Sequence, residues 1–149
     1  GLGDVYKRQV SYVRKLSLNC LVNSRSDPAY PLTRAYPDVP NPEQVSGWER
    51  YFYSILFDHG IHVIPQYPVE KYKLDFAIIA GSKKLDIEID GEMYHRDWND
   101  ELCYRDQLRN QRLFELGWDV KRFWVYQICD ELAKCIEEIK LWLREATTP

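Results

Sequence analysis

Acidic and apolar residues alternate over positions 85–91, Leu-Asp-Ile-Glu-Ile-Asp-Gly. Such alternation is typical of a half-buried β-strand, so the carboxylates of Asp86, Glu88 and Asp90 would share one strand face. Same-face neighbours lie about 7 Å apart, and at an effective dielectric constant near 20 each like-charged pair then costs roughly 2 kcal/mol. A cation would relieve this repulsion, and hard oxygen ligands suit Mg²⁺ or Mn²⁺. The alternative is an exposed acidic face that binds nothing.

A second strand is predicted over residues 73–80, directly before the acidic one. The turn residues between them, Gly-Ser-Lys-Lys at positions 81–84, predict an antiparallel hairpin. With the first and last turn residues paired, Asp75 would lie opposite Asp90 and diagonal to Glu88. Asp75 would thus be the fourth carboxylate of the cluster, and Asp86, which lies nearest the turn, is expected to be solvated.

A helix is predicted from Asn41 to Gly60, because Asn41 is a good N-cap residue, a proline follows it, and glycine ends helices readily. Glu49 lies on or beside the apolar stripe of this helix, where a carboxylate without a partner is costly. Glu49 could reach solvent, pair with an arginine, or lean over the acidic hairpin. The stripe consists of Val45, Trp48, Phe52, Ile55 and Leu56.

Two further segments carry candidate polar residues. Residues 62–69 read as a strand whose two prolines favour a sheet edge or a bulge, and Gln66 could face the site. Residues 98–116 read as a helix that places Asp106 and Arg109 on its buried stripe with three leucines. These two charged residues form either an intrahelical ion pair or a polar clamp that contacts phosphate.

The remaining segments complete an α/β order of helix, three strands, helix, strand, helix. Residues 118–124 read as the fourth strand. A long amphipathic helix follows, with a core-packing role. Its apolar stripe consists of Ile128, Leu132, Cys135, Ile136, Ile139 and Leu143.

Composition limits the function classes. The formal net charge of the chain is −3, and residues 41–149 carry 20 acidic against 14 basic side chains. A self-sufficient DNA binder needs a basic surface, so this balance disfavours one more than it disfavours a nuclease whose acidic site binds a metal. The four cysteines show no C-x-x-C spacing, and no long apolar run suggests a membrane span. We therefore expect a cytoplasmic protein of a prokaryote with reduced thiols.

Three ranges are expected along the chain. Residues 1–9 resemble the translation of a sequencing-library adapter and are excluded from fold arguments. Residues 10–40 are rich in proline and read as a linker or the remnant of an upstream domain. Residues 41–146 form the expected domain.

The run from Ser46 to about Trp124 resembles the PD-(D/E)XK nucleases of the restriction-endonuclease-like fold, in the branch near very-short-patch-repair endonucleases. It also resembles the domain at the C-terminus of some superfamily 1 DNA helicases. The segments that carry the likeness are Asp75-Phe76, residues 87–91 with His95, Arg105-Asp106 with Arg109, and residues 116–118 leading to Arg122.

The resemblance implies a mixed central sheet of about four strands flanked by helices, and metal-dependent hydrolysis of phosphodiester bonds. Asp75 and Glu88 match the two metal-ligating acids, and the backbone carbonyl of Ile89 matches the third ligand. Glu49 matches an acidic residue of the first helix. Mg²⁺ or Mn²⁺ would be the cofactor.

The chain departs from the family pattern at Asp90, which stands where the lysine of (D/E)XK is expected. Asp90 could be a direct ligand, a water-mediated ligand, or an acceptor that orients His95; we expect a ligand or near-ligand. His95 could act as general base or stabilise the scissile phosphate, and Lys73 is its rival. The candidate substrate contacts are Gln66, Lys73, Arg105 and Arg109.

The leading hypothesis is a magnesium-dependent DNA endonuclease module, joined in the native chain to an upstream helicase or other DNA-translocating domain that supplies affinity. Transient homodimerisation would let it cut both strands. The alternative is a DNA-binding or scaffolding module that kept the fold and lost catalysis, as the missing lysine suggests. Glycoside hydrolysis by a carboxylate pair is a third class, but four clustered acids exceed what it needs.

Overall fold

The order of elements in the structure, a computed structural model, agrees with the prediction. The structure describes residues 33–91 and 100–148, with side chains from residue 104 in the second range. The elements are a 3₁₀ turn η1 (Pro42–Gln44), α2 (Gly47–Asp58), β1 (Ile64–Val69), β2 (Tyr72–Ala80), β3 (Lys83–Asp90), α3 (Asp100–Glu115), β4 (Trp118–Trp124), α4 (Val125–Asp130) and α5 (Leu132–Thr147).

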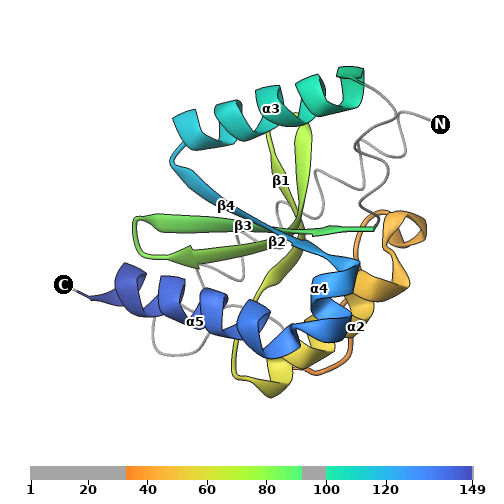
Figure 1. Ribbon diagram of the computed structural model, residues 1–149, viewed down its shortest axis with the longest axis vertical. Helices are drawn as coiled ribbons and strands as arrows, with labels where there is room; N and C mark the ends of the chain where they lie inside the picture. Colours follow the sequence, from red (N-terminus) through yellow and green to blue (C-terminus); the bar gives the residue numbers. More distant parts are fainter. Residues whose placement is uncertain (1–32, 92–99, 149) are drawn as a thin grey trace.

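The four strands form one mixed sheet in the order β1-β2-β3-β4 (Figure 1). β1 and β3 both pair antiparallel with β2, whereas β3 and β4 run parallel. A parallel pair needs a crossover connection, and α3 lies between these two strands in the chain. β1 is an edge strand, as Pro65 and Pro68 predict, because a proline has no N–H for a second neighbour.

The register of the β2–β3 hairpin differs from the prediction by two residues. Ala80 pairs with Lys83 and Phe76 pairs with Ile87, so the same register brings Asp75 opposite Glu88 rather than Asp90. The turn has the predicted length of two residues but lies one residue earlier, at Gly81 and Ser82, because Gly81, with φ +62°, provides the left-handed conformation that a two-residue hairpin turn needs. A shift of two residues leaves every side chain on its predicted face, so the acidic face is preserved.

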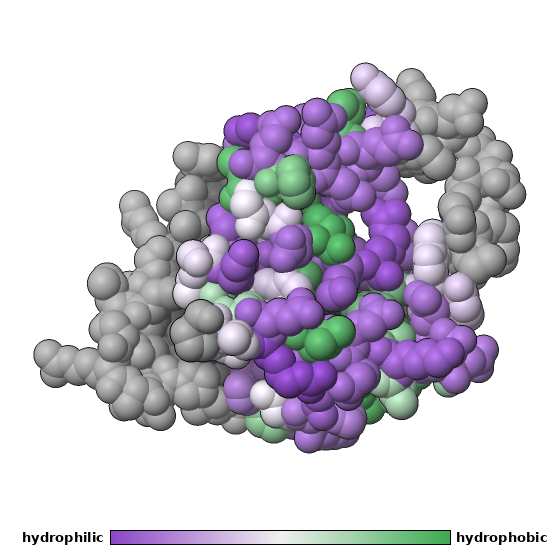
Figure 2. All heavy atoms as spheres, turned by 60° about the vertical axis from the view of Figure 1, so that its left-hand side comes forward, coloured by the Kyte–Doolittle hydropathy of each residue, from purple (hydrophilic) through white to green (hydrophobic). Residues whose placement is uncertain are grey.

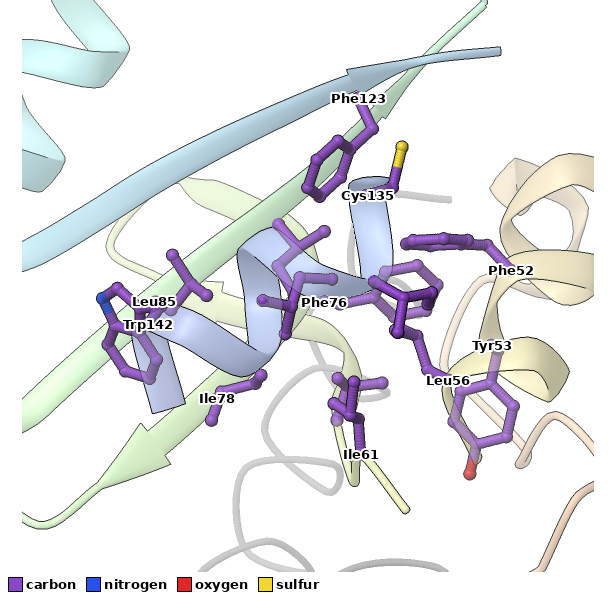
Figure 3. Close-up of a cluster of buried hydrophobic side chains, with 14 of the residues drawn as sticks. Phe52, Tyr53, Leu56, Ile61, Phe76, Ile78, Leu85, Phe123, Cys135 and Trp142 are labelled. Atoms are coloured by element: carbon purple, nitrogen blue, oxygen red, sulfur yellow. The ribbon is translucent and has the colours of Figure 1, made fainter. Parts of the chain in front are cut away.

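Helices cover both faces of the sheet (Figure 1). The larger apolar cluster joins Leu85 and Ile87 of β3 to Phe52 of α2 and Ile136 of α5 (Figure 3). A smaller cluster, which includes Leu113, packs α3 against the opposite face. The acidic residues of β3 point to this second face because they alternate with the apolar ones.

The first long helix begins five residues later than predicted. Residues 42–44 form a single 3₁₀ turn, and Val45 after them is extended. Ser46 is the N-cap of α2, and it forms a reciprocal capping box with Glu49. Trp48 is exposed, in contrast to its predicted place on the apolar stripe, and Tyr53 is buried in the core instead.

The C-terminal apolar stripe belongs to two helices rather than one. Glu131 has φ −132° and ψ 35°, outside the helical region, and separates α4 from α5. Ile128 and Cys135 are buried in the same cluster on either side of the break. The apolar spacing therefore continues across the break and gives no sign of it.

The segment before α2 also packs on the domain. The rings of Tyr36 and Tyr53 meet edge-on with their centroids 5.3 Å apart, and Arg34 Nε forms an ion pair with Asp58 Oδ1 at 2.8 Å. Hydrophilic side chains cover most of the face in Figure 2, where the apolar ones form small separate groups. None of the helices in the described parts of the chain is long and apolar enough to span a bilayer.

Candidate active site

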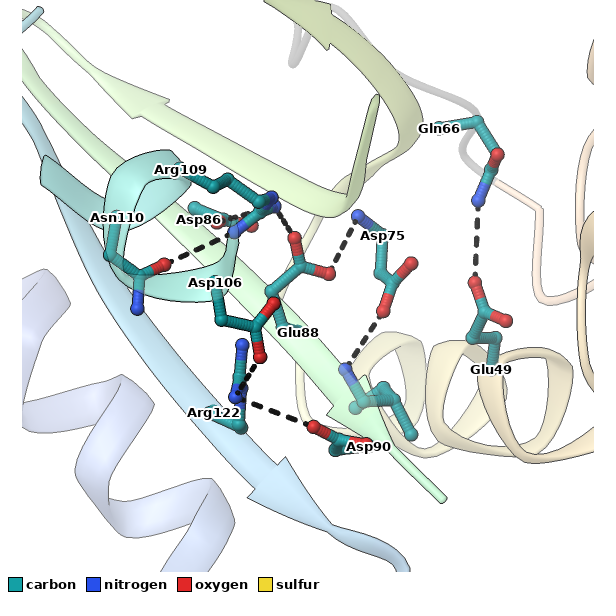
Figure 4. Close-up of polar contacts among 11 residues, drawn as sticks. Glu49, Gln66, Asp75, Asp86, Glu88, Asp90, Asp106, Arg109, Asn110 and Arg122 are labelled. Carbon is teal, nitrogen blue, oxygen red and sulfur yellow. Dashed lines mark hydrogen bonds and ion pairs between the residues drawn. The ribbon is translucent and has the colours of Figure 1, made fainter. Parts of the chain in front are cut away.

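Asp75 and Glu88 meet where β2 pairs with β3. The backbone N–H of Asp75 donates to Glu88 Oε2 at 3.3 Å, and the backbone N–H of Ile89 donates to Asp75 Oδ2 at 2.9 Å (Figure 4). The hairpin itself therefore fixes both carboxylates. The backbone of Ile89, whose carbonyl is the expected third ligand, lies at the same point.

Glu49 reaches this point from the first turn of α2. The side chain is 6% exposed, and its Oε2 accepts hydrogen bonds from the backbone N–H and the hydroxyl of Ser46, both at 2.8 Å. Gln66 Nε2 donates to its Oε1 at 3.3 Å (Figure 4). Of the alternatives for Glu49, the structure supports the position beside the acidic hairpin, with the amide of Gln66 as partner in place of an arginine.

The pKa values of Glu49 and Asp75 are both raised above their ordinary values. Burial, followed by the negative charge of Asp75, raises the pKa of Glu49 to about 7, although hydrogen bonds from Ser46 oppose the shift. Burial also raises the pKa of Asp75, while hydrogen bonds from Ile89 and from Glu49 and the nearby arginines lower it. Repulsion between two neighbouring carboxylates favours a proton or a cation between them.

Gln66 faces the site as predicted. It is 6% exposed and has φ +54° in β1, a left-handed conformation that is rare for a residue other than glycine. Local strain of this kind costs on the order of 1–3 kcal/mol and is concentrated at functional sites. The strained residue supplies the amide that holds Glu49.

Asp86 is completely buried, in contrast to the expectation that it would be solvated at the turn. Its Oδ2 accepts a hydrogen bond from Arg109 Nη2 at 3.1 Å, and the same Nη2 forms an ion pair with Glu88 Oε1 (Figure 4). Burial raises the pKa of Asp86 to about 7, and the charge of Arg109 opposes that shift. Position along a strand does not decide exposure here, because α3 covers this part of the acidic face.

A second charged network joins α3 to the sheet. Arg122 Nη1 of β4 contacts Asp106 Oδ2 at 2.9 Å and Asp90 Oδ2 at 3.5 Å. The prediction of an intrahelical ion pair between Asp106 and Arg109 is therefore wrong, since each residue pairs with a charged side chain of the sheet instead. The reason is that both lie on the face of α3 that packs on the strands. Asp90 pairs with Arg122 and is partly exposed.

The other candidates lie further out or outside the described residues. The ammonium group of Lys73 donates to the side-chain oxygen of Gln44. Arg105 lies on the exposed side of α3. His95 falls outside the described residues, so its role stays a prediction.

The donor set fits a divalent cation that keeps part of its water shell. Among residues 33–91 and 104–148, no three His, Cys, Asp or Glu side chains form a metal cage. Mg²⁺, however, is usually held by one or two carboxylates, water and substrate phosphates. Asp75 and Glu88 could supply the two carboxylates. Among the described residues, the cluster holds two arginines, Arg109 and Arg122, against six acids: Glu49, Asp75, Asp86, Glu88, Asp90 and Asp106.

Sequence reasoning missed two functional contacts of the site. Ser46 holds Glu49, and the spacing Ser-x-x-Glu of a capping box was a readable signal for it. The anchoring of Arg109 by Asp86 had no comparable signal. It depends on which residue of α3 packs over which residue of β3, and that is a tertiary relationship.

Comparison with known proteins identifies the family. The family model REase_MTES_1575, which is restriction-endonuclease-like, matches residues 48–143, about two thirds of the chain. The chain belongs to this family. Its match includes α2, the whole sheet and most of α5, and therefore every described candidate site residue.

A solved structure agrees with this restriction-endonuclease-like assignment. The catalytic domain of the homing endonuclease I-Bth0305I superimposes with a TM-score of 0.55 at 17% sequence identity, and the match covers 70% of this chain and 100% of that domain. At this identity the likeness shows the shared fold. None of the curated proteins matches the sequence significantly.

Proposed function

We propose that this restriction-endonuclease-like chain is a metal-dependent endonuclease domain that hydrolyses DNA phosphodiester bonds. The observation that carries the proposal is the junction of Asp75 and Glu88 through backbone hydrogen bonds, with Glu49 against Asp75. Family membership and the homing-endonuclease neighbour support the same reaction class.

Asp75, Glu88 and the backbone carbonyl of Ile89 would hold Mg²⁺ or Mn²⁺, with water and a DNA phosphate as the remaining ligands. When bound, such an ion lowers the pKa of a water molecule and stabilises the negative charge of the transition state. The chain's own contribution is to hold the two carboxylates in place. The hydrogen bonds of the hairpin do this before any ligand arrives.

Glu49 is the described residue best suited to move a proton. A carboxyl group with a pKa of about 7 is partly ionised at neutral pH, where a general base is most effective. Its Oε2 is held by Ser46 and its Oε1 by Gln66, so the carboxylate has a fixed direction beside Asp75. We propose that Glu49 accepts a proton from a water molecule held there. His95 is the rival base.

Asp90 and the basic residues would complete the site at its rim. Asp90, held by Arg122, stands where the family has a lysine, and we propose that it binds a water molecule of the metal site. Arg105, exposed on α3, and Lys73 would contact the DNA backbone. A helicase or other translocating domain in the native chain would supply the affinity that this acidic domain lacks.

Plasmid nicking tests the proposal. Purified protein should convert supercoiled DNA to the nicked form with Mg²⁺ or Mn²⁺ and not with a chelator. Asp75→Asn and Glu88→Gln, which preserve shape and remove charge, should each lower the rate by at least 100-fold. Arg112→Gln is the matched control because Arg112 pairs with Glu70 and Glu115 at the surface. Nicking that survives both site substitutions would contradict the proposal.

A non-catalytic DNA-binding or scaffolding module is the second candidate. Two observations favour it: Asp90 replaces the family's lysine, and the Glu88 carboxylate is held by Arg109. This candidate predicts DNA binding that is insensitive to Mg²⁺ and no nicking under any metal condition.

A further inference from the structure

We infer that Arg109, anchored by Asp86, is the positioning residue for Glu88 in the metal site. The inference rests on the proposed function, since it assigns a role within that site. It replaces the expectation that Arg109 contacts substrate phosphate.

The geometry of Arg109 is that of a bridge between two acids. Its Nη2 contacts Asp86 Oδ2 and Glu88 Oε1, while its Nη1 donates to Asn110 Oδ1 at 3.3 Å. The side chain is only 14% exposed, and its guanidinium carbon lies 6.0 Å from the ring centroid of Tyr72. A guanidinium with both terminal nitrogens engaged inside the protein has little capacity left for a DNA phosphate.

Glu88 is fixed at both oxygens as a result. Oε1 contacts Arg109, and Oε2 accepts the backbone N–H of Asp75. Each carboxylate oxygen has two lone pairs, so one hydrogen bond at each leaves capacity for a cation. Without the arginine, Glu88 would turn away from the neighbouring acids, because like charges at this spacing repel.

Asp86 explains why the arginine stays in place. It is the fully buried acid of β3, two residues before Glu88, and its Oδ1 has no hydrogen-bond partner in the part of the chain that the structure describes. Arg109 Nη2 is its ion-pair partner among the described residues. A buried carboxylate with one cationic partner holds that partner strongly, since separating them would leave an uncompensated charge in the interior. Partners of metal ligands that orient them in this way typically change metal affinity or activity by about 10–100-fold when they are removed.

Mn²⁺ titration by calorimetry tests the inference on the full chain, with folding checked by circular dichroism. Arg109→Gln should weaken Mn²⁺ binding by about tenfold or more. Arg109→Lys should recover part of the loss, because one ammonium group restores the charge without the two-sided bridge. Arg112→Gln, which makes the same charge change one turn along α3, should leave the affinity unchanged. If Arg109→Gln does not fold, Asp86→Asn is the second variant, and it should weaken binding in the same direction.

Cleavage kinetics separate positioning from phosphate binding. Arg109→Gln should raise the Mn²⁺ concentration for half-maximal rate and leave the KM for DNA unchanged, whereas loss of a phosphate contact would raise that KM. Mn²⁺ affinity of Arg109→Gln equal to or above that of the parent, with Glu88→Gln still impaired, would overturn the inference alone. If the parent binds no Mn²⁺, or Glu88→Gln binds it like the parent, the proposed function fails and the inference fails with it.

Discussion

The Glu49 carboxyl lies close enough to Asp75 for the negative charge of Asp75 to raise its pKa, although the two residues come from different elements, α2 and β2. Burial raises the pKa values of both acids, and the nearby positive charges do not fully offset this effect. A pair of this kind stores electrostatic energy that a proton or a cation can release.

The metal-free protein should lose stability as the pH rises. Because the folded-state pKa of Glu49 is raised to about 7, its contribution is complete below the unfolded value near 4.5 and is lost as the pH passes about 7. The loss should be up to about 3 kcal/mol. Glu49→Gln should reduce this slope in urea unfolding at pH 5 and pH 8 with a chelator present, and part of the slope should remain because the pKa of Asp86 is also raised to about 7. Equal slopes for the two proteins would show that Glu49 does not titrate in this range.

Arg109→Ala should lower the free energy of unfolding by about 3–5 kcal/mol, because it leaves the buried charge of Asp86 without compensation. Combining it with Asp86→Asn should cost less than the sum of the two single changes. Chemical denaturation of the four proteins of this cycle measures the coupling. Arg112→Ala, at an exposed pair, should change stability by less than about 1 kcal/mol. If the losses of unfolding free energy from Arg109→Ala and Asp86→Asn simply add, the two residues do not form a stabilising buried ion pair.

Ser46→Ala should destabilise the protein by about 1 kcal/mol, because the N-cap of α2 would lose its side-chain acceptor. Ser46→Thr keeps the hydroxyl and should restore most of the loss. Thermal unfolding of the two variants checks this. A parental melting temperature for Ser46→Ala would show that Glu49 alone caps the helix.

The buried thiol of Cys135 should resist alkylation in the folded protein, because burial, followed by the charges of Glu138 and Glu131, raises its pKa to about 11. Cys129 is exposed and should react first. Peptide mapping after iodoacetamide treatment at pH 8 distinguishes the two. Cys135 should react only after denaturant is added, and equal native-state labelling of both residues would contradict the packing of α5.

The strands were predictable because each carries a local signal. The alternation of residues 85–91 identifies β3, and the prolines of β1 identify an edge strand. The hairpin register was not predictable, because a two-residue turn can lie at residues 81–82 or 82–83, and the apolar pattern of the strands is the same for both. The break at Glu131 was likewise invisible, since the helical spacing of the core residues continues across it.

The site was predictable where it depends on faces and not where it depends on packing. Strand alternation puts Asp75 and Glu88 on one side of the sheet, and a helical stripe puts Glu49 beside it. The prediction that Asp86 is exposed was wrong because α3 covers that end of β3. The predicted pairing of Asp106 with Arg109 was wrong for the same reason. Two residues on one helix face can pair with each other or with the neighbouring sheet, and their spacing in the sequence is the same in both cases.

Anomalous X-ray scattering from crystals of the protein grown with Mn²⁺ and a short DNA duplex tests the central claim most directly. A single Mn²⁺ peak should lie about 2.2 Å from a carboxylate oxygen of Asp75 and from one of Glu88, with the carbonyl of Ile89 as the next protein ligand. Crystals of Glu88→Gln should lack the peak. A Mn²⁺ peak elsewhere, or none at these two residues while DNA is bound, would contradict the assignment of this carboxylate pair as the metal site.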